Sequence, residues 1–301
     1  MKSPIHFPNL ASAITALGCL VLTQTAALAN NLTPISAPSF GSSDHPLWLA
    51  QLDASDPPPR SSGGGTRLEK PPTRRGGGTR FVPPLPQGME APGHARGGAS
   101  RSTCPAVTTK LTALIPTAEV STQRANGRTH TTVNVFGQTV ADRPVFWFYV
   151  PYTNQVANLT EFVLQDATGK EIYKTPITLP QNPGVMAVRI PQDKPALESG
   201  KLYQWFFQYY CAPNKTSRPI FVNGWVQRIG LSADLKKQLT TATTLRERAQ
   251  IYDKNNLWFD ALTTLADARR AKPKDEALLG DWQKLLTEVD LSDIAAEPFT
   301  N

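Results

Sequence analysis

The stretch RPVFWFYVPY, residues 143–152, places five aromatic rings in ten residues of a chain that is only 8% aromatic. In a β-strand, successive side chains point to opposite faces. Both faces of this strand would be apolar, with Val145, Trp147 and Tyr149 on one and Phe146, Phe148, Val150 and Tyr152 on the other. We therefore expect a strand that is covered on both sides and whose rings pack in the interior. An aromatic groove for sugars or peptides is the alternative, and any site is expected on the loops at the strand ends.

Short segments rich in β-branched and aromatic residues recur before and after this stretch, separated by turn residues. The expected strands cover residues 111–115, 129–136, 144–152, 160–165, 171–179, 184–190, 201–211 and 219–229. Asn223 and Gly224 indicate a bulge in the last of them. Seven or eight such strands without intervening helical periods predict an antiparallel β-sandwich of the Ig-like kind. A small closed barrel is the alternative.

From Ser232 the spacing at which apolar residues recur changes from two to about 3.6 residues, as in helices. This pattern predicts a C-terminal helical subdomain of three or four helices and hence an α+β protein. Thr244 and Glu247 form the sequence of a capping box at the start of a helix over 245–254. The helices expected over 245–254 and 257–271 resemble one tetratricopeptide-type hairpin. The residues that carry this resemblance are Ala249, Tyr252, Ala261, Leu265, Ala268 and Pro273. Because one such hairpin cannot bury its own face, we expect it to pack on the outer face of the sandwich.

The N-terminal third does not have the composition of a folded domain. Residues 1–29 have the pattern of a secretory signal, with Ala27-Leu28-Ala29 before a cleavage site between Ala29 and Asn30. Residues 30–102 are rich in Pro, Gly, Ser and Arg and predict a disordered linker. The domains that follow are a sandwich over 103–230 and the helical subdomain over 231–301. The sequence Gly-Gly-Gly-Thr-Arg occurs at 63–67 and at 76–80, which favours a flexible spacer, with binding to anionic polymers as the alternative.

Charge and cysteine content fit an exported protein. The formal net charge is +7. In an exported chain, this charge favours anionic envelope polymers over nucleic acid as the oppositely charged partner. Once a signal is removed, Cys104 and Cys211 are left, and two cysteines in an oxidising compartment predict a disulfide. Two separate buried thiols are the alternative, and lipidation at Cys19 is an alternative to signal cleavage after Ala29. No segment after the signal has the apolar length of a membrane span.

The sequence contains no pattern typical of catalysis. His130 is the only histidine of the expected folded part, and a lone histidine is more often structural than catalytic. We predict no catalytic residue, no cofactor-binding residue and no metal ligand, because no cluster of ligand-type residues has the spacing of a metal site. A hydrolase whose carboxylates come from distant strands stays open. The oligomeric state has no signature in the sequence.

Residues 93–299 resemble a family of exported cyanobacterial proteins, numbered 928 among the domains of unknown function. The stretches that carry the resemblance are 97–101 with Cys104-Pro105, 111–116, 143–152, 161–166, 203–207, 224–226 and 258–262. The resemblance implies an exported protein and implies no activity and no catalytic residue.

Together these observations favour a non-enzymatic, exported binding or interaction module of the cell envelope. An envelope protein or a polysaccharide is the expected ligand. The alternatives are an envelope polysaccharide or peptide hydrolase with dispersed carboxylates, and a nucleic-acid or anionic-polymer binder that uses the Gly/Arg linker.

Overall fold

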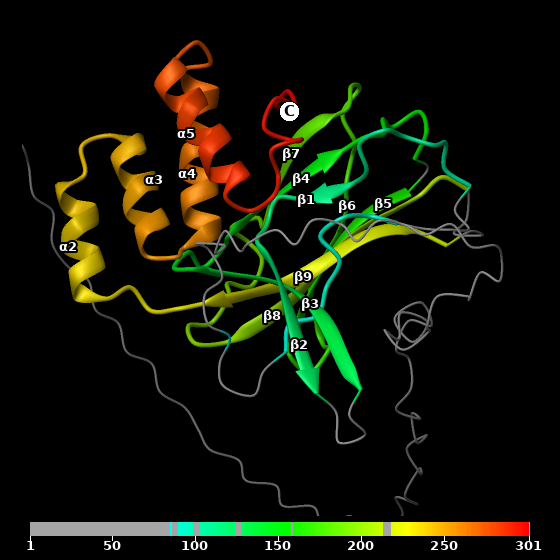
Figure 1. Ribbon diagram of the computed structural model, residues 1–301, viewed down its shortest axis with the longest axis horizontal. Coiled ribbons are helices and arrows are strands. Elements are labelled where there is room, and N and C mark those ends of the chain that lie inside the picture. The colour runs from blue at the N-terminus through cyan, green and yellow to red at the C-terminus, as the bar shows by residue number, and fades with distance from the viewer. Residues whose placement is uncertain are drawn as a thin grey trace, which may run out of the picture. The chain divides into compact units, whose positions relative to one another are not determined.

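The computed structural model describes residues 85, 90–98, 103–123, 128–157, 159–212 and 218–300. All of them belong to one compact unit, Pro72–Asn301, which is described by itself. Within these residues the chain forms nine strands in two sheets and four helices, an α+β fold as predicted (Figure 1). The predicted signal with its cleavage site at Ala29 and Asn30, Cys19, and the Gly-Gly-Gly-Thr-Arg repeats lie outside the described residues.

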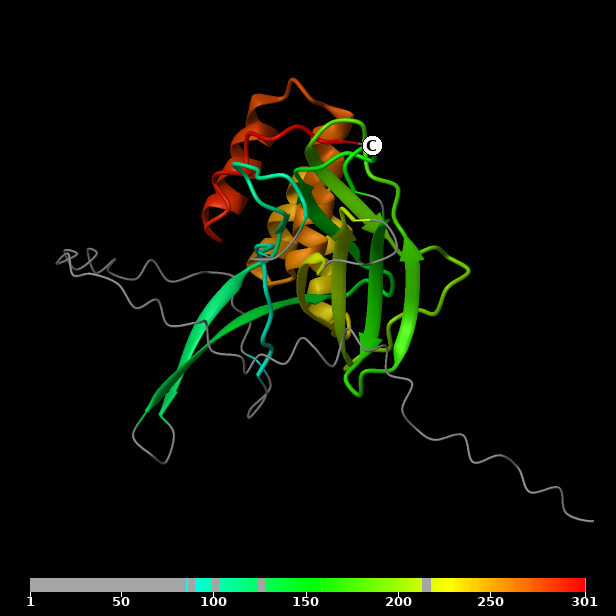
Figure 2. The same cartoon turned by 90° about the vertical axis from the view of Figure 1, so that its right-hand side faces the viewer.

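The larger sheet has six strands. Their order across the sheet is β2 (Thr117–Gln123), β3 (Thr129–Thr139), β9 (Ile220–Arg228), β8 (Leu202–Tyr210), β5 (Leu159–Asp166) and β6 (Glu171–Pro176). Figure 2 shows the outer ends of β2 and β3 extending away from the other strands. Strands β3 and β9 are parallel, whereas every other pair in this sheet is antiparallel. The prediction of an entirely antiparallel sandwich is therefore wrong for this pair. Side chains alternate between the two faces in parallel and antiparallel sheets alike, so the sequence pattern does not determine strand direction.

The smaller sheet is built around the aromatic stretch 143–152. Its order is β1 (Thr112–Ala113), β4 (Val145–Val150) and β7 (Gly184–Arg189), all antiparallel. Every residue of β4 is buried, which confirms that this strand is covered on both faces.

The rings of β4 pack in two directions. On one face, Phe148 stacks on Phe207 of the larger sheet with centroids 4.5 Å apart, so the two sheets face each other through aromatic side chains. On the other face, the indole nitrogen of Trp147 donates to Thr263 Oγ1 at 3.0 Å, and its ring meets Phe299 edge-on. The prediction that these rings pack in the core is confirmed, because Trp147 and Phe148 are at most 3% exposed. The Ig-like strand arrangement stays a prediction.

The helices are α2 (Ala233–Thr241), α3 (Leu245–Lys254), α4 (Trp258–Ala271) and α5 (Glu276–Thr287), and they lie together on one side of the strands (Figure 1). Helix α4 contacts both sheets, β3 of the larger one and β4 of the smaller one. The ring of Phe259 lies 5.4 Å from that of Phe146, and the indole of Trp258 donates to the carbonyl of Leu114 at 2.9 Å. The predicted packing of the helices on the strands is confirmed, but α4 does not lie on an outer face alone, because Phe146, which Phe259 contacts, also packs against Trp205 of the larger sheet. None of the helices in the described part of the chain has the length and apolarity of a membrane span.

Three local predictions differ from the structure. The run 111–115 contributes only the two-residue strand β1, and Pro116 is followed by β2, which was not predicted. Asn223 and Gly224 pair with β8 without a register shift, so no bulge forms there. Gly224 instead allows close approach, since a Cβ at this position would lie 2.6 Å from both Trp205 and Val135 side-chain atoms. The sheet irregularity falls at Leu164/Gln165.

Two further links hold the distant parts of the chain together. Cys104 and Cys211 form the predicted disulfide, which joins the segment before β1 to the end of β8. Residues 91–97, which fall in the expected linker, are paired in the described structure: Pro92 with Asn134 of β3, His94 with Asn223 of β9, and Arg96 with Thr112 of β1. The folded part of the chain thus includes this segment.

Candidate binding groove between the helices

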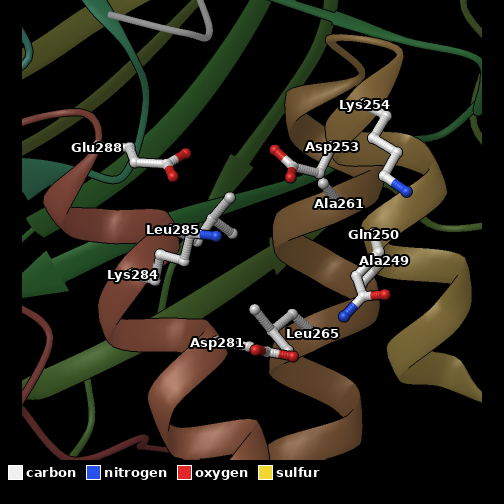
Figure 3. Close-up of a pocket in the computed structure, with 10 residues that line it drawn as sticks. All are labelled: Ala249, Gln250, Asp253, Lys254, Ala261, Leu265, Asp281, Lys284, Leu285 and Glu288. Atoms are coloured by element: carbon white, nitrogen blue, oxygen red, sulfur yellow. The ribbon is translucent and has the colours of Figure 1, made fainter.

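A groove of about 160 Å³ lies between α3 and α5, and α4 forms its floor (Figure 3). Its walls are Ala249, Gln250, Asp253 and Lys254 of α3 and Asp281, Lys284, Leu285 and Glu288 at α5, with Ala261 and Leu265 of α4 beneath. Residues three and four apart share one face of a helix, so each wall is a single face. At about 30 Å³ for each water molecule, the groove has room for one long side chain rather than a large ligand.

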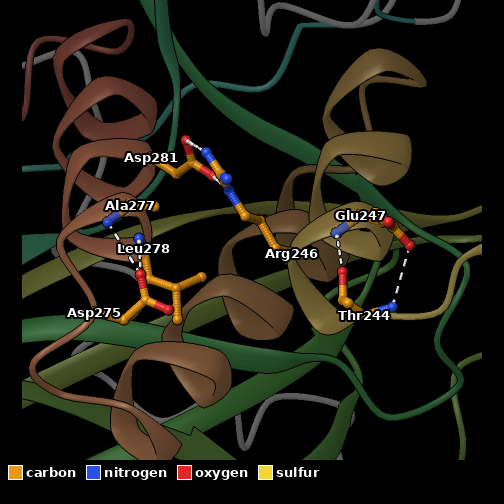
Figure 4. A network of polar contacts seen from close by, with 7 residues as sticks. All are labelled: Thr244, Arg246, Glu247, Asp275, Ala277, Leu278 and Asp281. Atoms are coloured by element: carbon orange, nitrogen blue, oxygen red, sulfur yellow. Dashed lines mark hydrogen bonds and ion pairs between the residues drawn. The ribbon is translucent and has the colours of Figure 1, made fainter.

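The helix ends that frame the groove are defined by local sequence (Figure 4). Thr244 Oγ1 accepts from the Glu247 amide at 3.1 Å, and Glu247 Oε2 accepts from the Thr244 amide at 3.2 Å, which confirms the predicted capping box. Asp275 caps α5 by accepting from the amides of Ala277 and Leu278. These side chains satisfy amides that a helix start leaves without intrahelical partners.

Small and apolar residues form the floor. Ala249 and Ala261 are 5% and 1% exposed, and their small side chains allow α3 and α4 to lie close together. Leu265 and Leu285 are also buried. Ala249, Ala261 and Leu265 are three of the six residues that carried the resemblance to a tetratricopeptide-type hairpin, and α5 supplies the second wall of the groove.

The rim of the groove carries both signs of charge. Arg246 of α3 holds Asp281 of α5 through two hydrogen bonds, Nε to Oδ2 at 2.5 Å and Nη2 to Oδ1 at 3.1 Å (Figure 4). This guanidinium lowers the pKa of the Asp281 carboxyl, and the same bond raises the pKa of Arg246. The pair is partly exposed, so it orients the two helices and contributes little net stability.

Asp253 and Glu288 lie on opposite walls, and their carboxylates extend toward the space between the helices (Figure 3). Lys254 and Lys284 follow on the same two walls. An apolar floor under carboxylates suits the stem and head of a long cationic side chain, because such side chains bury their methylenes and keep the charge at the surface. No histidine or cysteine lines the groove.

A second cavity, of about 170 Å³, lies at the junction of the β3–β4 loop with α4, and it is lined by Thr139, Arg143, Tyr252, Asp260 and Thr263 among others. Asp260 Oδ2 accepts from the Val140 amide at 3.1 Å. Burial raises the pKa of Asp260 to about 6, against the lowering effect of bonds from Thr139 and Val140. The cavity lies at strand ends, where a site was expected. Asp260 could not be recognised from the sequence, because one aspartate in a helical pattern carries no signal.

Two other polar residues of the folded part, His130 and Asp166, form local contacts. His130 lies on the exposed part of β3, with Nδ1 3.2 Å from Thr132 Oγ1. Asp166 accepts from the Thr168 hydroxyl at 2.6 Å and from two backbone amides, as in a turn. Within the described ranges, no group of three or more Cys, His, Asp or Glu side chains is placed to hold a metal ion. The groove could have been found in the sequence from the charged positions that repeat at helical spacing on 250–254 and 281–288.

The fold and the groove define an α+β protein of two facing sheets with helices packed on one side of the strands. A family model described as Domain of Unknown Function (DUF928) matches residues 96–299, and the chain belongs to that family. The matched range includes both sheets, all four helices and the groove. The comparison with curated proteins finds no match.

Proposed function

We propose that this protein is an exported, non-enzymatic binding module of the cell envelope that holds a protein partner in the groove between α3 and α5. The observation that carries the proposal is the groove itself, with the buried Leu265 and Leu285 beneath and Asp253 and Glu288 on opposite walls. A long basic side chain of a partner matches this arrangement, with its methylenes on the leucines and its charge between the acids.

Export is supported by two features of the chain. Residues 1–29 have the pattern of a cleavable secretory signal ending at Ala29. The Cys104–Cys211 disulfide is of the kind that persists in oxidising compartments. The resemblance to exported cyanobacterial proteins supports the same location and a cyanobacterial origin.

A protein partner is favoured over a polysaccharide. Sugar-binding sites commonly present aromatic rings, and none lines the groove, while the large rings of β4 and β8 are buried. A rim with both carboxylates and ammonium groups suits the mixed charges of a protein surface better than a polymer of one charge.

A hydrolase acting on envelope polymers is the second candidate, because Asp253 and Glu288 place two carboxylates on opposite sides of one groove. Hydrolysis by such a pair would require one acid and one base or nucleophile. Turnover of envelope polysaccharide or peptide that is lost in Asp253→Asn would support the hydrolase and contradict the binding module.

The test is saturable binding of the mature chain to proteins extracted from native envelope, followed by photo-crosslinking from Gln250. Glu288→Gln should weaken binding at least fivefold, and added salt should weaken it further. Glu276→Gln is the matched control, since Glu276 is an exposed residue of the same helix that does not line the groove. Equal binding by the two variants, or no saturable binding, would contradict the proposal.

A further inference from the structure

Strand β8 is buried on both of its faces. Phe207 stacks on Phe148 of the smaller sheet, so its neighbours Phe206 and Gln208 point to the opposite, outer face of the larger sheet. An antiparallel sheet that packs on a core with one face commonly exposes the other face to water. Phe206 and Gln208 are nevertheless only 4% and 0% exposed. Their burial therefore requires a cover on the outer face.

The buried area continues onto the neighbouring strand. Phe206 pairs with Val163 of β5, and Gln208 pairs with Glu161 of the same strand. Directly paired residues of an antiparallel pair lie on one face. Val163 and Glu161 are 0% and 8% exposed. We call these four residues the outer patch.

The N-terminal segment covers a neighbouring part of the same face. Leu85 packs against a small apolar cluster formed by Ala91, Phe136 and Leu202. Leu202 is four positions before Phe206 on β8 and so lies on the same face. Beside this cluster, the indole of Trp225 donates to the Pro92 carbonyl at 3.1 Å. An extended, proline-containing segment thus already lies against the edge of the outer face.

This small cluster ends short of the outer patch. Val163 and Phe206 belong to none of the apolar clusters that the described residues form. Gln208 Nε2 donates to Glu161 at 3.1 Å, but Gln208 Oε1 is buried and accepts no hydrogen bond within the described part of the chain. The outer patch therefore combines apolar side chains with an acceptor that a covering segment can satisfy.

The place of Leu85 indicates where a covering segment enters. From Leu202 to Phe206 is four residues along β8, or about 13 Å at about 3.3 Å for each strand residue. Phe81 is four residues before Leu85, and an extended segment of that length spans about 12–14 Å. With Leu85 on the cluster that includes Leu202, Phe81 can therefore reach Phe206.

The residues before Leu85 have the composition of such a cover. Positions 81–84 are Phe-Val-Pro-Pro, whereas positions 73–80 have no large apolar side chain. Phe81 and Val82 supply apolar area for the outer patch. Pro83 and Pro84 have no N–H, so their burial leaves no amide without a partner, and they favour an extended conformation. The Val82 amide is a donor of the kind that the patch lacks.

We propose that residues 81–84, which lie outside the described part of the chain, dock on the outer patch as an extended proline-rich segment. Proline-rich segments commonly dock on aromatic surfaces, and here the surface and the segment belong to one chain. The Gly/Arg-rich linker then starts from the outer face of the larger sheet at residue 80. This docking surface is independent of the groove proposed between the helices.

The first test is photo-crosslinking in the intact mature chain. A benzophenone amino acid in place of Phe81 should crosslink at least tenfold more to β5 and β8 than to the other strands, as mapped by mass spectrometry. The same amino acid in place of Trp48 is the matched control, since Trp48 is an aromatic position of the expected linker. It should show no such preference.

Thiol labelling tests the cover in a second way. Val163→Cys should be protected in the mature chain, and adding Phe81→Asp should raise its labelling rate at least tenfold, whereas adding Trp48→Asp should not. Ala266→Cys, buried in α4, should stay protected in both backgrounds, which shows that the chain is folded. A peptide of residues 78–85 at about 1 mM, the order of concentration that a short tether provides, should restore the protection.

The proposal is overturned if the residue at position 81 crosslinks elsewhere. It is also overturned if Phe81→Asp leaves the labelling of Val163→Cys unchanged, because the cover then comes from another part of the chain. If Phe81→Asp also exposes Ala266→Cys, the variant is unfolded, and the crosslinks made in the folded chain decide.

Discussion

Asp260 is an acid whose surroundings favour its protonated form. It lies in the first turn of α4, accepts from the Val140 amide, and shares its cavity with Arg143 and Tyr252. Burial raises its pKa from an ordinary 3.8 to about 6. Between these values the folded chain binds more protons than the unfolded chain, so the free energy of unfolding falls as pH rises through this window.

Replacing Asp260 by Asn should remove this pH dependence. The amide oxygen can still accept from Val140, and it carries no charge to desolvate. We expect the variant to be more stable than the parent at pH 7 by on the order of 1–3 kcal/mol, and the difference to vanish near pH 4. Urea unfolding between pH 4 and 7 measures this, with Asp267→Asn on the exposed side of the same helix as control. An unchanged slope in Asp260→Asn would show that burial does not control this carboxyl.

At the level of elements, α4 packs tightly against β3 at Gly137. A Cβ there would lie 2.9 Å from Phe259 Cε2 and 3.4 Å from Trp258 Cβ. Gly137→Ala should therefore lower the free energy of unfolding by about 1–3 kcal/mol through overpacking. Gly280 of α5 has no atom within 4 Å of such a Cβ, so Gly280→Ala should raise stability by up to about 1 kcal/mol. Denaturant unfolding of both variants checks the opposite signs, and a neutral Gly137→Ala would contradict the tight packing of α4.

Individual elements could be predicted from sequence where their determinants are local. The alternation in β4 and the pair Thr244 and Glu247 act over a few residues, and both predictions are confirmed. The parallel pairing of β3 with β9 was not predictable in this way, because it depends on contacts between residues far apart in the chain. The same holds for the positions of β6 and β7, which are outermost in their two sheets. The groove between the helices could be predicted in part, because the residue spacing indicated α3 and α4 but not how they are arranged with α5.

At the scale of the whole folded unit, contacts between distant segments join its parts. Arg96 holds Asp293, after α5, through bonds of 2.6 and 2.8 Å. In the same segment, 91–97, Pro92 pairs with β3 and His94 with β9, and Arg96 itself pairs with Thr112 of β1. This one segment therefore links both sheets to the C-terminal region. The Arg96 guanidinium lowers the pKa of Asp293, but both side chains are more than 40% exposed, so the ion pair itself adds little.

The disulfide also joins distant segments, and it does so covalently. It stabilises the fold mainly by lowering the conformational entropy of the unfolded chain. Cys104 and Cys211 are 107 residues apart, and closing a loop of that length stabilises the fold by about 4–5 kcal/mol in the chain-entropy model. Changing both cysteines to Ala should keep the native structure and lower the free energy of unfolding by about 2–5 kcal/mol. The denaturant slope should rise, because an uncrosslinked unfolded chain exposes more surface. Adding reductant to the parent should reproduce the shift and leave the double variant unchanged. If the midpoint of the parent does not move on reduction, the strands and the segment 91–97 hold the fold without the crosslink.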